Sequence, residues 1–191
     1  MNQFIHFFQT GFFHIVSLQS VYPILFVLLF TITLAFSDWK RVLVLVSAVA
    51  VSHALALLLA HYGIIRLSGN LGLAVPLIIF FTALFHIFTA GKPAQKDGVG
   101  LILILTIVFG FIRGLTYSGF SNATKGTSEL LSLLAISVGI WCGLFVLSFL
   151  LMLIGYAIQF LFRFSNKEWV LCGASIVIGY ISSVLLKFLS F

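Results

Sequence analysis

The sequence predicts an all-α integral membrane protein: a single domain over residues 1–191, folded as a bundle of about six transmembrane helices with an N-terminal apolar helix. Three observations lead to this fold class. The chain is 62% hydrophobic and only 7% charged, its mean hydropathy is +1.25, and it contains several apolar stretches of spanning length. A soluble domain carries about 25% charged residues. We therefore expect a lipid bilayer to surround this protein.

The apolar stretches define the predicted helices. A transmembrane helix needs about 20 mostly apolar residues. The segments that meet or approach this length are residues 22–37, 42–62, 71–90, 99–120, 130–162 and 169–190. The fifth is longer than one crossing requires, so we expect it to tilt or project from the membrane. Ser165 and Glu168 match a capping box that would begin the last helix.

Residues 1–19 precede these segments and permit two interpretations. Phe4, Phe7, Phe8 and Phe12 recur at helical spacing, which predicts an amphipathic or re-entrant helix on the outer face or dipping into the bundle. A seventh span is the alternative, and it would move the N-terminus to the inner side. The segment has no basic n-region and no A-x-A site, so we do not expect a signal peptide.

The basic residues predict the orientation. The loops between spans 1–2, 3–4 and 5–6 carry Lys40, Arg41, Lys92, Lys96, Arg163 and Lys167. The opposite side carries Arg66, Lys125 and Lys187. By the positive-inside rule, the first set of loops is cytoplasmic and both termini lie outside. The net charge of +6 is therefore interpreted as a topology signal, and no nucleic-acid partner is expected.

Ionisable side chains within apolar spans are the first indicators of function in a membrane protein. His53 lies about 18 Å above the predicted inner loop, counting 1.5 Å per residue, and Arg113 lies somewhat further out. His14 is in the N-terminal helix. The other residues predicted to line a polar cavity in the outer half of the bundle are Ser52, Tyr22, Tyr117, Ser137 and Trp141. A purely structural role is the alternative for each.

An enzymatic activity is not expected. The apolar spans contain no nucleophile–base pair, no pair of acidic residues and no HExxH element, and these are the groups that intramembrane hydrolysis would need. Cys142 and Cys172 lack metal-binding spacing, so we interpret them as packing residues. No resident cofactor is predicted.

The order of several short motifs resembles the HupE/UreJ family. The matching elements are His14-Ile15, Tyr22-Pro23, Leu25-Phe26, "SHALAL" (52–57), "IFTAGK" (87–92), "GFIRGLTY" (110–117) and "SVGIWCGL" (137–144). The likeness covers nearly the whole chain. It implies a bacterial inner-membrane protein associated with hydrogenase or urease maturation and a permease for nickel or cobalt, the metal being the transported ion.

The departures from the family pattern affect its polar positions. Tyr22-Pro23 stands where the family has Asp-His, Arg113 stands at a family histidine, and Ser137 and Trp141 replace an Asn and a Glu. His14 and His53 remain as metal-ligand candidates, since imidazole binds Ni²⁺ and Co²⁺. A guanidinium opposes such an ion, because a +2/+1 pair at 6 Å costs about 5 kcal/mol at an effective dielectric of 20.

Three functions remain open from the sequence. The first is a transition-metal permease with a divalent metal ion as partner and a site reduced to His14 and His53. The second is a non-transporting accessory or structural membrane protein that keeps only the bundle. The third is an anion or lipid-head-group site at Arg113. The sequence does not indicate the oligomeric state.

Overall fold

A computed structural model describes residues 2–17, 21–34, 38–65, 71–91, 96–116 and 129–189, and every element within these ranges is helical. The helices are α1 (Asn2–Val16), α2 (Val21–Thr31), α3 (Trp39–His61), the 3-10 turn η2 (Leu71–Leu73), α4 (Ala74–Thr89), α5 (Lys96–Thr116), α6 (Glu129–Phe162) and α7 (Asn166–Leu189). The predicted all-α class is thus confirmed.

Within the described residues, fewer helices meet the length and composition of a membrane span than the sequence predicts. Three helices within the described ranges are long and apolar enough to cross a membrane, namely α3, α6 and α7. The bent pair α1 and α2, whose axes differ by 66°, adds a fourth if it is counted as one span. α4 and the Gly100–Thr116 part of α5 are shorter apolar helices. The prediction of about six transmembrane helices is therefore not confirmed.

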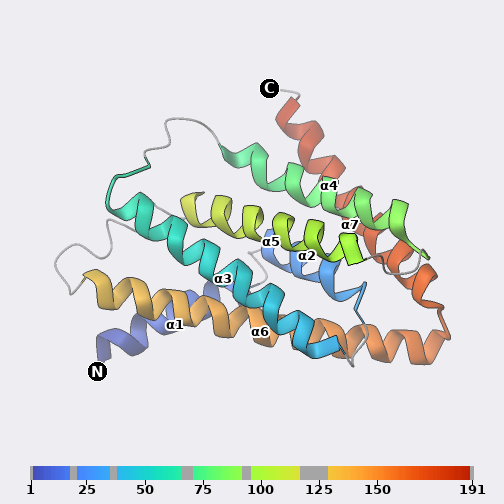
Figure 1. Cartoon of the computed structure of the whole chain (residues 1–191), viewed down its shortest axis with the longest axis horizontal. Helices are drawn as coiled ribbons and strands as arrows, with labels where there is room; N and C mark the ends of the chain where they lie inside the picture. The colour runs from blue at the N-terminus through green and yellow to red at the C-terminus, as the bar shows by residue number, and fades with distance from the viewer. Residues whose placement is uncertain are drawn as a thin grey trace.

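Of the first predicted span, residues 22–37, the structure describes one helix, α2, which ends at Thr31. α2 has 11 residues, about 16 Å at 1.5 Å per residue, which is too short to cross the hydrocarbon core alone. α1 lies along the first half of α6, and α2 continues toward the other end of the bundle (Figure 1). The N-terminal segment thus packs against α6, and it forms with α2 a bent pair that is either a broken span or a re-entrant segment.

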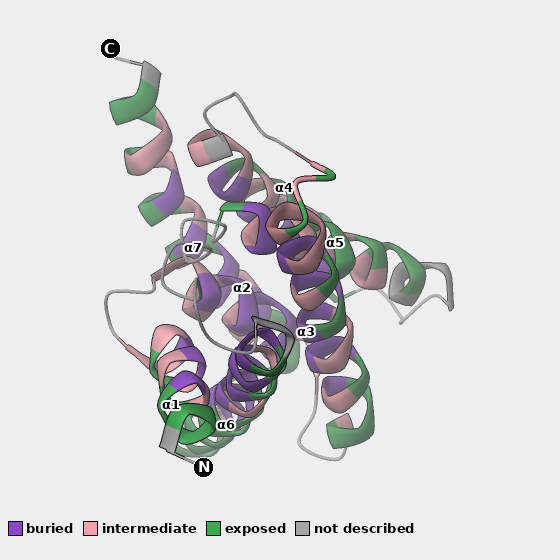
Figure 2. Cartoon of the chain, turned by 90° about the vertical axis from the view of Figure 1, so that its left-hand side faces the viewer, coloured by how far each residue is buried: buried purple, intermediate pink, exposed green. Residues whose placement is uncertain are grey.

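The core lies where α2, α3 and α6 face one another (Figure 2). α2 is the central element, with Phe26, Val27, Leu29 and Phe30 all buried. The Phe26 ring stacks on Phe109 of α5 with a centroid distance of 3.8 Å. Large apolar side chains on the outer faces of the helices remain exposed, as expected for a protein surrounded by lipid.

Small residues bring α1 against α6. A Cβ at Gly139 would collide with the carbonyl oxygen of Phe8, and one at Gly143 would lie 3.0 Å from the Phe12 carbonyl oxygen. A Cβ at Gly11 would collide with the Ile136 carbonyl in the same way. Gly139 and Gly143 form a GxxxG pair, the spacing that lets helix backbones approach closely in membranes. This contact fixes the position of α1.

A second GxxxG pair brings α5 against α3. Gly110 faces the Ser52 side chain and the Val49 backbone, and Gly114 faces the His53 carbonyl. A Cβ at Gly114 would lie 2.7 Å from the Cβ of Ala56. Since Gly114 follows Arg113 directly, this contact places Arg113 at the level of His53.

The connection between α6 and α7 contains the predicted capping box. The Ser165 backbone N–H donates to Glu168 Oε2 at 2.8 Å, and the Glu168 N–H donates back to Ser165 Oγ at 3.3 Å. Arg163, just after α6, adopts a left-handed φ of 53°, which ends the helix. The chain therefore reverses within a few residues and α7 begins with its first N–H groups satisfied.

Candidate functional site

The candidate site lies where α1, α3 and α5 approach one another. Arg113 Nη2 lies 3.2 Å from His14 Nε2. A guanidinium is only a donor, so His14 Nε2 accepts this hydrogen bond and the imidazole is protonated on Nδ1. Both residues lie within electrostatic reach of His53. The structure thus gathers the three ionisable residues that the sequence singles out, each from a different helix.

The cluster extends from the core toward the surface. His53 is only 3% exposed and lies on the face of α3 that contacts α5. His14 and Arg113 are half-buried. The cluster therefore combines one fully buried side chain with two that are partly exposed.

Tyr22 adds a hydroxyl group to this cluster. It is the second residue of α2 and lies within electrostatic reach of Arg113 and of Tyr180 on α7. His14 is the third residue from the end of α1. The end of α1 thus carries the hydrogen-bond partner of Arg113, and the start of α2 carries a phenol within electrostatic reach of the same guanidinium.

Sequence reasoning missed Tyr180. Depth counting could have found it, because Tyr180 lies 14 residues after the start of α7 and His53 lies 14 residues after the start of α3. At 1.5 Å per residue both are about 21 Å along their helices. A phenol at the depth of a buried histidine in an apolar span is a usable signal.

The serines predicted to line the site use their hydroxyl groups within their own helices. Ser52 Oγ donates to the carbonyl of Ala48 at 2.7 Å, and Ser137 Oγ donates to that of Leu133 at 2.8 Å. Ser52 also fills the contact beneath Gly110. Tyr117, the remaining predicted hydroxyl residue, lies outside the described residues.

The depth of Trp141 predicted a position in the polar cavity with His53 and Arg113, but the structure gives it a different neighbour. Its indole Nε1 donates to Ser47 Oγ at 3.1 Å, and its ring stacks with Phe145. Ser47 lies six residues before His53 on α3, about 9 Å along the helix. Trp141 therefore connects α6 to α3 beside Ser47, away from the histidine cluster.

The metal-binding capacity of the site is small. The described part of the chain contains no group of three or more His, Cys, Asp or Glu residues able to hold a metal ion. His14 and His53 supply two imidazoles, and Arg113 already donates to one of them. Borderline metals usually take several nitrogen, sulfur or oxygen ligands, so most ligands of a bound ion would have to be water.

A family model for the HupE / UreJ protein matches residues 1–187. The chain belongs to the HupE/UreJ family. The match covers nearly the whole chain and confirms the resemblance seen in the motifs. No curated protein and no solved structure matches this HupE/UreJ chain. Membership supports an accessory membrane protein linked to metal handling.

Proposed function

We propose that this HupE/UreJ protein is a permease of the bacterial inner membrane for a divalent transition metal, nickel or cobalt, in which Arg113 gates a path past His14 and His53. The observation that carries the proposal is the convergence of these three residues from α1, α3 and α5 beside the break between α1 and α2. Ionisable residues inside a membrane bundle are functional by default.

The broken helix supports transport. Secondary transporters often bind their substrates where a membrane helix is discontinuous, and the C-terminal ends of the half-helices favour cations. Here His14 lies in the last turn of α1, where the partial negative charge of the helix end is located. A cation at His14 would gain from this field.

Arg113 acts as a gate because it occupies the nitrogen that a metal would use. The guanidinium donates to the Nε2 lone pair of His14, so metal binding requires the arginine side chain to move away. One such hydrogen bond contributes roughly 1–2 kcal/mol, which is small enough for ligand binding to overcome. Two imidazoles and water would then hold the ion weakly, as conduction requires.

Two other functions are supported by separate observations. The described residues of the site offer only two imidazole ligands for a metal ion, His14 and His53, and this favours a non-transporting accessory protein. The hydroxyl group of Tyr22, within electrostatic reach of Arg113, favours an anion site, because a guanidinium and a phenol are both hydrogen-bond donors. One set of experiments distinguishes the three functions.

The test is uptake of radioactive nickel and cobalt into proteoliposomes. We expect uptake by the parent protein, faster uptake by Arg113→Gln, and loss of uptake in His53→Gln. Lys187→Gln, a charge change near the end of α7, is the control and should behave as the parent. Absence of uptake in the parent and in every variant contradicts the permease and leaves the accessory protein. Thermal protection by an anion that disappears in Arg113→Gln would favour the anion site.

A further inference from the structure

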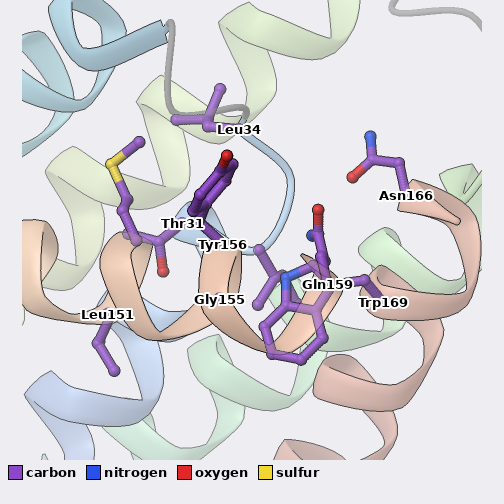
Figure 3. A pocket seen from close by; sticks show the side chains of 10 residues that line it. Thr31, Leu34, Leu151, Gly155, Tyr156, Gln159, Asn166 and Trp169 are labelled. Carbon is purple, nitrogen blue, oxygen red and sulfur yellow. The ribbon is translucent and has the colours of Figure 1, made fainter. Parts of the chain in front are cut away.

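A pocket of about 490 Å³ lies at the other end of the bundle, between the end of α2, the last part of α6 and the start of α7 (Figure 3). Its volume is within the range of roughly 300–1,000 Å³ that small-molecule sites occupy. Two basic residues of the predicted cytoplasmic loops lie nearby in sequence: Arg163 in the α6–α7 connection and Lys167 in the first turn of α7. The pocket therefore opens near the predicted cytoplasmic face, apart from the His14–Arg113 pair.

The lining of this pocket has an apolar part and a polar part. Ile32, Leu34 and Met152 contribute alkyl and thioether groups. Gln159 and Asn166 contribute side-chain amides, which lie along one side of the pocket together with the Trp169 indole (Figure 3). Amides and indoles offer N–H donors. An occupant with an apolar part and a polar, hydrogen-bond-accepting end matches this division.

Gly155 keeps the pocket open beside Trp169 because it has no side chain. A Cβ at this position would lie 3.2 Å from Trp169 Cζ2, tighter than an ordinary van der Waals contact. Thr31, at the end of α2, donates its hydroxyl to the Leu28 carbonyl at 2.9 Å. Its methyl group is thus the part that remains for an apolar occupant.

The pocket lies at the level of an aromatic belt. Tyr156, Phe160 and Phe162 are strongly exposed at the end of α6, with Phe160 78% exposed. Tyrosine and tryptophan gather where the hydrocarbon core meets the lipid head groups, and Tyr156 and Trp169 both line the pocket. The polar part of the pocket is therefore at head-group depth, and the apolar part extends along α6 toward the hydrocarbon.

The nearby charges favour an anion. Arg163 follows Gln159 by four residues and Lys167 adjoins Asn166, and both cations are exposed. Glu168 is the nearby acidic residue, and its carboxylate accepts from the Ser165 N–H and hydroxyl. Basic residues next to a membrane helix attract anionic lipids.

We propose that this pocket binds an anionic phospholipid of the predicted cytoplasmic leaflet. The acyl chain lies against Ile32, Leu34 and Met152, and the phosphate accepts hydrogen bonds from the Gln159 and Asn166 amides. Arg163 and Lys167 supply the preference for negative charge. The proposal does not depend on metal transport.

Trp169 gives a direct readout, because brominated acyl chains quench a tryptophan that they contact. The chain has three tryptophans, so the measurement uses a Trp39→Phe/Trp141→Phe background in phosphatidylcholine vesicles. The difference between the parent and Trp169→Phe isolates the same signal without removing the Trp141–Ser47 hydrogen bond. Brominated phosphatidylglycerol and brominated phosphatidylcholine are then compared at increasing mole fraction.

We expect half-maximal quenching at an about 25-fold lower mole fraction of the anionic lipid, since Arg163 and Lys167 each contribute a factor of about five. The preference should disappear in Arg163→Gln/Lys167→Gln and persist in Lys187→Gln. Quenching by both lipids should weaken in Gln159→Leu/Asn166→Leu and persist in Gln9→Leu, a matched change at an exposed position of α1.

Three results would overturn the proposal. The first is equal quenching of the parent by both lipids. The second is an unchanged preference in Arg163→Gln/Lys167→Gln. The third is displacement of the brominated anionic lipid by inorganic phosphate, which would make the pocket a site for a free phosphate.

Discussion

Arg113 and His14 are 99 positions apart in sequence, and the guanidinium Nη2 lies 3.2 Å from the imidazole Nε2. This contact joins α5 to α1, although α5 packs mainly on α3 and α1 packs mainly on α6. The pair is thus a polar link between two helix pairs, which the Trp141–Ser47 hydrogen bond also connects.

The link should be measurable as a coupling energy. Arg113→Gln and His14→Phe each remove the hydrogen bond, and each should lower the free energy of unfolding by roughly 1–2 kcal/mol. Because the two changes remove the same contact, the double variant should lose less than the sum, with a coupling of about 1 kcal/mol. Denaturant unfolding in detergent measures the cycle. Strict additivity would show that the pair contributes nothing in solution.

Gly139 should be intolerant of alanine. A methyl group there would collide with the Phe8 backbone, so Gly139→Ala should cost about 1–3 kcal/mol through displacement of α1. Gly179→Ala is the matched control: its Cβ would meet nothing within 4 Å, and it should gain up to about 1 kcal/mol from helix propensity. Thermal unfolding of both variants checks the prediction. Similar midpoints for the two would contradict the close packing of α1 on α6.

His86 should limit stability. Its side chain is 1% exposed, and its Nε2 has no hydrogen-bond partner in the described part of the chain. Replacing a buried polar group that lacks a partner by an apolar side chain of similar size removes a desolvation cost, so His86→Leu should add about 1–2 kcal/mol. Thr82→Val is the control, since the Thr82 hydroxyl donates to the Ile78 carbonyl. A destabilised His86→Leu would indicate that His86 has an undetected partner.

Substitution of Trp141 tests whether this residue belongs to the functional site. Trp141→Phe removes the hydrogen bond to Ser47 and should lower the free energy of unfolding by about 1 kcal/mol. Nickel uptake should stay at the parent level, because the indole lies beside Ser47 and not in the His14–Arg113–His53 cluster. Tyr22→Phe, by contrast, removes a hydroxyl near Arg113 and should change uptake. Loss of nickel uptake in both variants would show that Trp141 belongs to the functional site.

Hydropathy and motif order were sufficient for the fold class and the family. They also gave the depth of His53 and Arg113, because an α-helix rises by a constant 1.5 Å per residue. Depth does not give rotation about the helix axis, which depends on how neighbouring helices pack. For this reason Ser52 and Trp141 were predicted at a suitable depth, while the structure places their polar groups against Ala48 and Ser47.

The number of membrane spans was harder to predict from the sequence for a related reason. Residues 22–37 are mostly apolar, and composition alone cannot show that α2 begins at Val21 and ends at Thr31. The close contact of α1 with Gly139 and Gly143 is a long-range property that no local pattern in residues 1–19 reveals. The broken helix is therefore visible only once α6 is in place.

The close packing of α1 on Gly139 and Gly143 of α6 restricts how α1 can move. Sliding α1 by one turn would drive Phe8 and Phe12 out of the recesses at Gly139 and Gly143, and so would break many backbone contacts at once. Rotation of the Arg113 side chain breaks a single hydrogen bond and leaves every helix in its place. Rotation of the Arg113 side chain is therefore the motion of lowest energy at this site. We expect the proposed gate to open on the timescale of a side-chain rotation, which is faster than that of a helix shift.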